Sequence, residues 1–142
     1  MDDNNETVQN DSPITPVANG KRVLCIEDEH FISELYERAL TKAGYAVNMV
    51  VDGNAGLAEA KTNQYDIILL DLMLPNKSGL DILQELRDSD KTPELKAKII
   101  IATNLDQGKE GRAAVESKAD GYIVKAEVTP KQLVVFLQQL DV

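Results

Sequence analysis

One carboxylate stands directly after a continuous apolar stretch. Asp71 follows Ile67–Leu70, a run typical of a strand that is covered on both faces. Other reactive or charged groups follow other apolar runs in the same way: Glu27, Asp28 and Glu29 after the first, Thr103 after the fourth and Lys125 after the fifth. A carboxylate can act as a nucleophile, neighbouring acids can bind a hard cation, and a hydroxyl and an ammonium can hold an anionic group.

The apolar runs that carry these residues are short and rich in β-branched side chains, which is typical of strands. They are Arg22–Ile26, Ala46–Val50, Ile67–Leu70, Lys98–Ala102 and Gly121–Val124. Longer amphipathic segments separate them, and this alternation predicts a parallel sheet with helices on both faces and right-handed crossovers. In such an open sheet the functional site lies beyond the carboxyl ends of the strands, which is where the acids, the hydroxyl and the ammonium fall.

Five helices are expected between and after these strands. The first has an apolar row at every fourth residue and is expected to end at Gly44; the row is Phe31, Leu35, Ala39 and Ala43. The second is the Ala-rich segment Asn54–Asn63. The fourth spans about Gly108–Lys118, although Gly111 inside it weakens the helical propensity.

The third and the last helix have clear starting signals. Ser78 is expected to cap the third, whose core face would use Leu80, Leu83 and Leu86. In the last helix Thr129 and Gln132 form a capping-box pair, and Pro130 takes the first helical position. Its apolar stripe consists of Leu133, Phe136, Leu137 and Leu140.

Each polar residue at the strand ends also has an ordinary structural interpretation. Glu29 begins a helix and is expected to face solvent, and Asp52, after the second strand, indicates a turn. A single Thr103 or Lys125 at a strand end would usually be structural or exposed. His30, the single histidine, is expected at the surface. Their joint placement on adjacent strand ends favours a functional site.

Four segments, in this order and spacing, carry a resemblance to a known family: "VLCIEDEH", "YDIILLDLMLPNKSG", "IIIATN" and "GYIVK". Over residues 21–142 the sequence resembles the receiver domain of bacterial two-component response regulators. The resemblance implies an α/β fold, the flavodoxin-like (βα)5 doubly wound parallel sheet with strand order 2-1-3-4-5. No single segment is decisive, but their common register makes a strong combined signal.

The resemblance also implies roles for particular residues. Asp71 matches the phospho-acceptor of the family. Glu27 and Asp28 match its acidic pair, which with Asp71 and the backbone carbonyl of Met73 holds Mg²⁺. Thr103 matches the switch hydroxyl, Lys125 the lysine of the motif and Tyr122 the aromatic switch residue, although Tyr122 could also be an ordinary half-buried aromatic.

The chemistry fits this set of residues. Carboxylates on neighbouring strands repel one another in a partly desolvated pocket, so a positive group is expected there, and a hard divalent cation with oxygen ligands suits the site. Asp71 could then attack a phosphoryl group that Mg²⁺, Lys125 and Thr103 neutralise. The dianionic product is expected to draw Thr103 inward, move Tyr122 from exposed to buried, and change the surface of the fourth helix, fifth strand and fifth helix.

By the same resemblance, the phosphoryl donor is a histidine kinase or a histidine phosphotransfer protein, and a downstream effector protein reads the change. The expected protein is a signalling phospho-acceptor that catalyses only its own phosphorylation and dephosphorylation. It is expected to be a monomer or a weak dimer through the fourth helix, fifth strand and fifth helix, with no direct contact to nucleic acid or membrane.

Three positions differ from the usual pattern of the family. Ala126 follows Lys125 where proline, often after a cis bond, is common, so either a strained cis bond of about 3 kcal/mol or a rearranged loop is expected. Asn104 stands where a small residue is usual, and its amide is expected to narrow the entrance or to bond the phosphate. Met73 and Leu105 are apolar at positions that influence hydrolysis, which predicts a phosphoryl group that lasts longer than seconds.

Composition bounds the remaining possibilities. The chain has 142 residues, 43% of them hydrophobic and 27% charged, which predicts one soluble domain in the cytoplasm. The net charge of −9 argues against non-specific binding to nucleic acid or anionic membranes. The single cysteine, Cys25, excludes an internal disulfide and is expected to be buried.

Residues 1–20 are acidic and poor in large apolar side chains, so a disordered tail is predicted before the domain at 21–142.

Two other functions use similar residues. A haloacid-dehalogenase-like phosphatase has a nucleophilic aspartate at a strand end, but it also needs an acid two residues later, where this chain has Met73. A receiver-like scaffold that binds partners without phosphorylation is the stronger alternative, and the joint presence of Asp28, Asp71, Thr103 and Lys125 argues against it.

The chain ends soon after the last predicted helix, so either a stand-alone regulator or a receiver from a longer protein is expected.

Overall fold

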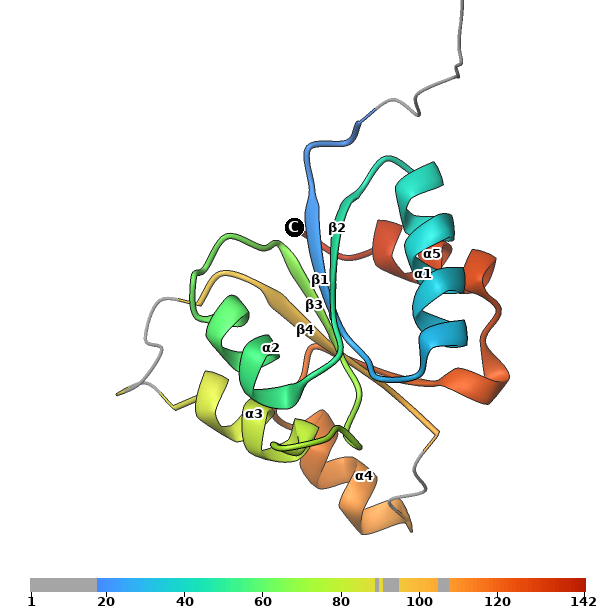
Figure 1. Ribbon diagram of the computed structural model, residues 1–142. Coiled ribbons are helices and arrows are strands. Elements are labelled where there is room, and N and C mark those ends of the chain that lie inside the picture. Colours follow the sequence, from blue (N-terminus) through green and yellow to red (C-terminus); the bar gives the residue numbers. More distant parts are fainter. Residues whose placement is uncertain (1–17, 89, 91–94, 105–107) are drawn as a thin grey trace, which may run out of the picture.

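The computed structural model describes residues 18–88, 90, 95–104 and 108–142 (Figure 1). The strands are β1 (Arg22–Ile26), β2 (Ala46–Val50), β3 (Ile67–Leu70), β4 (Lys98–Thr103) and β5 (Gly121–Val124). The helices are α1 (His30–Lys42), α2 (Gly53–Ala60), α3 (Gly79–Leu86), α4 (Gly108–Glu116) and α5 (Pro130–Gln138), with a short 3₁₀ helix η1 (Lys125–Glu127) before α5. The predicted alternation of strands and helices is confirmed.

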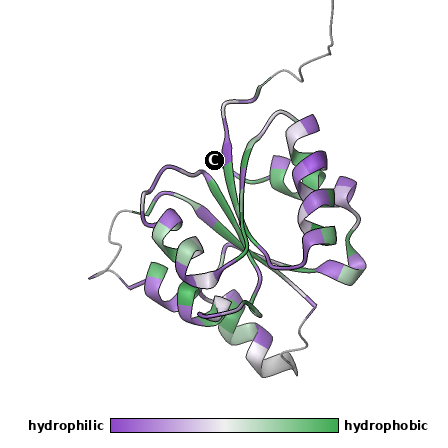
Figure 2. Ribbon diagram, in the orientation of Figure 1, coloured by the Kyte–Doolittle hydropathy of each residue, from purple (hydrophilic) through white to green (hydrophobic). Residues whose placement is uncertain are grey.

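The strands form one parallel sheet in the order β2-β1-β3-β4-β5, which confirms the predicted topology. Helices α1 and α5 cover one face of the sheet, and α2, α3 and α4 cover the other (Figure 1). The central strand β3 is apolar throughout because both of its faces are covered, and its neighbours β1 and β4 are largely apolar after a charged first residue, as the colouring of Figure 2 shows. This layering leaves the ends of the strands as the place where polar side chains can gather.

Two hydrophobic cores lie on the two faces of the sheet. On the α2, α3 and α4 face the core includes Leu24, Ile68 and Leu83, and on the α1 and α5 face it includes Val23, Leu40 and Leu133. Cys25 belongs to the second core and is buried, as expected. Burial raises the pKa of its thiol well above the ordinary value, so this group is an unreactive part of the packing.

The predicted core faces of two helices were partly wrong. In α1 the side chain of Phe31 is 72% exposed, and the buried residues are Ser33, Tyr36 and Leu40. In α3 Leu80 is 38% exposed, and Ile82 is buried together with Leu83 and Leu86. The predicted row of α1 is spaced by four residues and that of α3 by three, whereas a helix has 3.6 residues per turn. Each row therefore drifts around its helix, and its first residue does not face the core.

The other helix predictions differ from the structure only at the ends. Helix α2 ends at Ala60, three residues earlier than predicted, because Asn63 takes a left-handed conformation with φ of 56°. Helix α4 ends at Glu116 rather than Lys118. The capping box of α5 is confirmed: Gln132 N–H donates to Thr129 Oγ1 at 3.1 Å, and Thr129 N–H donates to Gln132 Oε1 at 2.9 Å.

The first part of the predicted tail, residues 1–17, lies outside the described residues. Within the described chain, Asn19 N–H already donates to the carbonyl of Gly44 at 3.0 Å, beside the start of β1. In the same described ranges, none of the helices combines the length and the apolar character needed to cross a membrane.

Candidate functional site

The register of the sheet brings the predicted site residues to one edge. Ile26 of β1 pairs with Leu70 of β3, so the residues that follow each strand, Glu27 and Asp71, lie beside one another. The backbone continues this pairing beyond the strands, since Asp71 N–H donates to the carbonyl of Ile26 at 3.1 Å. On the other side of β3, Thr103 at the end of β4 pairs with Val124, the residue before Lys125.

Lys125 is the centre of the site. Its Nζ donates to Glu27 Oε1 at 2.7 Å, to Glu29 Oε1 at 2.8 Å and to Asp71 Oδ2 at 3.1 Å. The side chains of Lys125, Glu27 and Asp71 are only 2%, 3% and 6% exposed, whereas that of Glu29 is 56% exposed. One ammonium therefore serves three carboxylates, two of which are buried.

Glu29 begins a helix and is exposed to solvent, as predicted, but its contact with Lys125 was not predicted. Glu29 is the N-cap residue of α1, yet its side chain makes no capping hydrogen bond. Its backbone N–H instead donates to Glu27 Oε2 at 3.1 Å, which turns the chain so that both carboxylates reach the same ammonium. A glutamate at a position that usually holds Ser, Thr, Asp or Asn was the available sign that its carboxylate is used elsewhere.

A pocket of about 410 Å³ opens above these groups. Its lining residues are Asp28, Glu29, Asp71, Met73, Thr103, Asn104 and Lys125. Asp71 and Thr103 are buried at 5% and 1% exposure, so they form its floor, whereas Asp28 and Met73 are exposed at its rim. Asp28, Asp71, Thr103 and Lys125 thus share one hollow, whereas Glu27 is not part of its lining and contacts Lys125 below it.

The electrostatics of the pocket follow from burial. Loss of solvation raises the pKa of Glu27 to about 7, although hydrogen bonds from Lys125 and from the backbone of Glu29 act in the opposite direction. Burial also disfavours the charge of Lys125, but the carboxylates of Glu27, Glu29 and Asp71 outweigh it and raise the pKa of the ammonium. Lys125 therefore stays charged, while the carboxylates around it keep an excess of negative charge.

Three of these carboxylates are arranged as a cation site would require. Glu27, Asp28 and Asp71 each offer one oxygen, and the three oxygens lie within 4.8 Å of one another. An all-oxygen set of this kind fits Mg²⁺, which prefers carboxylates and retained water. Met73, the predicted source of a carbonyl ligand, lines the same pocket, and its N–H donates to Asp71 Oδ1 at 3.2 Å.

The two unusual positions beside the pocket contact each other. The described residues contain no cis peptide bond, so the Lys125–Ala126 bond is trans and the loop is rearranged into η1. Asn104 lines the pocket, as expected of a residue at its entrance, but its Oδ1 accepts a hydrogen bond from Ala126 N–H at 2.8 Å. Of the two apolar positions expected to influence hydrolysis, Met73 lines the pocket and Leu105 lies outside the described residues.

Asp52, His30 and Tyr122 lie outside the residues that line this pocket. Asp52 caps α2 by accepting from Ala55 N–H at 2.8 Å, and it also contacts Asn76. His30 is exposed at the start of α1, as expected. Tyr122 is half-buried on β5, and the guanidinium of Arg112 from α4 lies 4.4 Å from the centroid of its ring.

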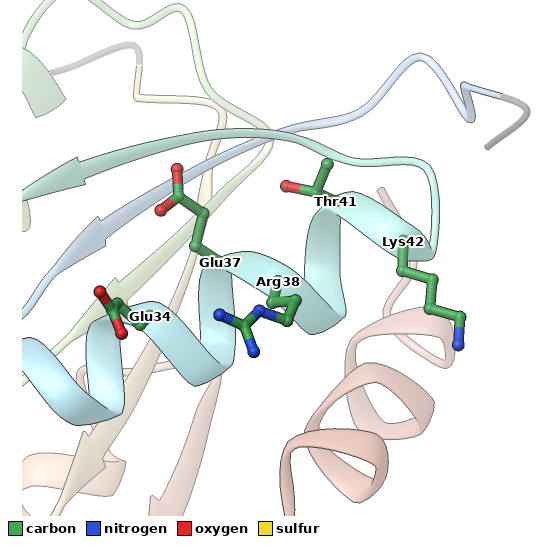
Figure 3. A pocket seen from close by; sticks show the side chains of 5 residues that line it. All are labelled: Glu34, Glu37, Arg38, Thr41 and Lys42. Atoms are coloured by element: carbon green, nitrogen blue, oxygen red, sulfur yellow. The ribbon is translucent and has the colours of Figure 1, made fainter. Parts of the chain in front are cut away.

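A second hollow lies along α1 and is lined by Glu34, Glu37, Arg38, Thr41 and Lys42. All five side chains come from this one helix, and they spread apart instead of converging on a point (Figure 3). A set of mixed charges on one exposed helical surface gives no means of orienting a ligand. The pocket at the strand ends, whose side chains converge, is therefore the stronger candidate for the functional site.

Comparisons with known proteins agree with this fold. The sequence model of the response regulator receiver domain matches residues 23–138. The response regulator ArlR of Staphylococcus saprophyticus is 40% identical over 104 residues, which are 73% of this chain and 45% of that protein. The chain therefore spans about half the length of this curated relative.

Solved structures give the same result. A CheY-like response regulator receiver domain from Methanospirillum hungatei superposes with a TM-score of 0.72 at 26% identity, covering 84% of this chain and 91% of that one. A response regulator from Burkholderia pseudomallei, whose structure has a phosphorylated aspartic acid and a calcium ion, gives a TM-score of 0.68 at 28% identity, covering 84% and 67%.

These matches and the geometry of the pocket define the class of protein. The chain belongs to the response regulator receiver domain family, the phospho-accepting module of two-component signalling.

Proposed function

We propose that Asp71 is the residue of this receiver domain that accepts the phosphoryl group. The observation that carries the proposal is the position of its carboxylate, buried at the floor of an open pocket and 3.1 Å from the ammonium of Lys125. Burial keeps competing water away from one side of the group, and the ammonium can neutralise charge that arrives with the phosphorus. Asp28 and Thr103, in the same pocket, complete the set that such a reaction needs.

In the proposed reaction a carboxylate oxygen of Asp71 attacks the phosphorus atom of the donor. A new P–O bond forms as the bond from phosphorus to the nitrogen of a phosphohistidine breaks, and the electron pair leaves with the donor. Mg²⁺ held by Glu27, Asp28, Asp71 and the carbonyl of Met73 would supply positive charge for the phosphoryl oxygens. Lys125 balances a second oxygen, and the hydroxyl of Thr103 can donate a hydrogen bond to a third.

Phosphorylation of Asp71 would require the Lys125 ammonium to change its hydrogen-bond partners. In this structure its ammonium serves Glu27, Glu29 and Asp71 together. A phosphoryl group on Asp71 would place strong acceptors within reach of that ammonium, and the exposed Glu29 is the partner that can withdraw to solvent at the least cost. We therefore expect Glu29 to leave and Glu27 to stay when Asp71 is phosphorylated.

The proposed output is a change at α4, β5 and α5. Thr103 is buried at the end of β4, and Tyr122 is half-buried on the next strand, with Arg112 of α4 over its ring. Inward movement of Thr103 toward the phosphate would make room for Tyr122, whose contact with Arg112 would then break. Beryllofluoride with Mg²⁺, which imitates an acyl phosphate, is expected to shift the ring resonances of Tyr122; resonances that do not move would contradict the switch.

The partners follow from the class of protein. We propose a histidine kinase or a histidine phosphotransfer protein as the donor and an effector protein as the reader of the α4, β5 and α5 surface. We also propose a cytoplasmic protein that acts on no substrate other than itself, as a monomer or a weak dimer through this surface. The net charge of −9 supports the absence of direct contact to nucleic acid or membrane.

Incubation with acetyl phosphate and Mg²⁺ is expected to add the mass of one phosphoryl group to the protein. Asp71→Asn should gain none, because an amide cannot act as the nucleophile. Asp52→Asn is the matched control, since Asp52 also follows a strand but caps α2, and it should gain the same mass as the wild type. Intact-mass spectrometry checks all three proteins. Equal gain by Asp71→Asn and the wild type would contradict the proposal, and slow loss after donor removal would support a long-lived phosphoryl group.

Mg²⁺ binding is expected to weaken as the pH falls below about 7. Burial raises the pKa of Glu27 to about 7, so below that value its carboxyl holds a proton that the cation must displace. The apparent dissociation constant should rise by about tenfold for each pH unit. Calorimetric titration with MgCl₂ at pH 8 and pH 6 measures it, and Glu27→Gln should bind weakly at both. Equal wild-type affinity at the two pH values would exclude Glu27 as a ligand that titrates in this range.

A further inference from the structure

The peptide unit that follows Lys125 is held at both of its polar atoms. Its oxygen, the carbonyl of Lys125, accepts from Val128 N–H at 3.4 Å. Its nitrogen, that of Ala126, donates to Asn104 Oδ1 at 2.8 Å. The first contact lies within the local turn, whereas the second reaches across to the end of β4. The amide plane next to Lys125 is thus fixed by its own turn and by the neighbouring strand.

The bond from Asn104 continues the pairing of two strands beyond the sheet. Thr103 and Val124 are the last partners in the register of β4 and β5, and Asn104 and Lys125 are the next residues of each chain. After Lys125 the chain turns into η1, so backbone pairing with β4 stops. The side chain of Asn104 spans the gap by accepting from the N–H of Ala126, the second residue of η1, a group that a 3₁₀ turn itself leaves without an internal partner.

This bond depends on the residue type at both ends. A proline at position 126 would have no N–H to donate, and it would also disfavour the helical conformation that Lys125 takes in η1. A small residue at position 104 would have no acceptor. Asn104 and Ala126, two of the positions where the sequence departs from the common pattern, therefore belong to one structural arrangement.

We infer that Asn104 is a positioning residue for Lys125, which acts by fixing the peptide unit from which the lysine side chain departs. The Lys125 ammonium must meet three carboxylates within 3.1 Å, so a rotation of its backbone would displace the charge from Asp71. This role deepens the proposed phosphoryl transfer, on which its catalytic consequence rests. Asn104 acts through Lys125, in contrast to a residue that touches the donor.

Nuclear magnetic resonance of the lysine ammonium group tests the inference without any phosphorylation. Buried and bonded to carboxylates, the Lys125 ammonium should give a slowly exchanging ¹H–¹⁵N signal in the wild type, assigned by its loss in Lys125→Met. Asn104→Ala should broaden or abolish that signal. Asn19→Ala should not, although Asn19 Oδ1 also accepts from a backbone N–H, that of Lys21, at 2.8 Å. Asn104→Asp, which keeps an acceptor oxygen, should retain the signal.

The rate of phosphorylation by acetyl phosphate and Mg²⁺ supplies the second measurement. Asn104→Ala should react about fivefold more slowly than the wild type, the factor expected for one lost hydrogen bond. In a Lys125→Met background the same substitution should change the rate by less than about twofold, because its target is gone.

The outcomes separate the two proposals. An unchanged ammonium signal in Asn104→Ala, or an equal slowing with and without Lys125, would overturn the positioning role and leave the phospho-acceptor intact. A wild type that gains no phosphoryl group would overturn the proposed function, while the ammonium signal would still decide the role of Asn104. If thermal unfolding shows that Asn104→Ala is not folded, Asn104→Leu removes the acceptor with a side chain of similar volume and takes its place.

Discussion

Replacement of Lys125 by methionine is expected to lower the free energy of unfolding by about 3–5 kcal/mol, the usual result of removing one member of a buried ion pair. The ammonium is the shared partner of Glu27 and Asp71, whose side chains are only 3% and 6% exposed. Without it, two buried carboxylates face each other without a counter-charge. Urea denaturation at pH 8 in the absence of divalent cations measures the effect where both carboxylates would otherwise be ionised.

The controls separate charge from packing. Lys125→Arg keeps the charge and should lose less stability than Lys125→Met, although its planar group cannot reproduce the three contacts. Lys131→Met, on the exposed side of α5, should change stability by less than about 0.5 kcal/mol. Added Mg²⁺ should restore part of the loss in Lys125→Met by supplying positive charge. If Lys125→Met were as stable as the wild type, the carboxylates would not be charged in the absence of a cation.

Gly79→Ala is expected to destabilise the protein by about 3 kcal/mol or more and to slow phosphorylation at the same time. A Cβ atom on Gly79 would lie 1.9 Å from the carbonyl oxygen of Asp71 and 2.6 Å from Cα of Leu72. Both are backbone atoms, so no side-chain rotation can relieve the overlap. The segment that carries Asp71 would have to move away from α3, and the hydrogen bond from Gly79 N–H to the carbonyl of Leu72, now 2.9 Å long, would stretch.

Leu80→Ala provides the comparison for this prediction. Leu80 is the next residue of the same helix turn and is 38% exposed, so its truncation should cost about 1 kcal/mol or less and leave the phosphorylation rate unchanged. Urea denaturation and the acetyl phosphate reaction, measured for both variants, distinguish a general weakening of α3 from a displacement of Asp71. If Gly79→Ala kept the stability and the phosphorylation rate of the wild type, the turn would have space for a Cβ atom at position 79, which contradicts the prediction.

Much of the fold could be predicted because its signals are local. The apolar run Ile67–Leu70 and the capping pair Thr129 and Gln132 each lie within a few residues, and the structure confirms both elements. The faces of the helices were harder to predict. Phe31 and Leu80 are apolar residues in amphipathic helices, yet both are exposed, because helix rotation is set by packing against the sheet and not by any one residue.

The positions of the site residues could be predicted where they follow from the topology of the parallel sheet. The contacts between individual side chains could not. Strand ends place Glu27, Asp71 and Lys125 together once the topology is known. The unusual N-cap glutamate indicates only that the carboxylate of Glu29 is used elsewhere. Its partner, and the bond between Asn104 and Ala126, could not be predicted, since each contact joins residues far apart in the sequence. The sequence marked Asn104 and Ala126 as unusual, but only the structure shows that they form a pair.

The most direct measurement of the central claim is the position of the phosphoryl group itself. After reaction with acetyl phosphate and Mg²⁺, borohydride reduces an aspartyl phosphate to the corresponding alcohol and leaves unmodified carboxylates intact. Peptide mass spectrometry should then find the reduced residue at Asp71 and at none of the neighbouring acids, Glu27, Asp28 or Glu29. Reduction at one of these other residues, or at none, would contradict the assignment of Asp71 as the phospho-acceptor.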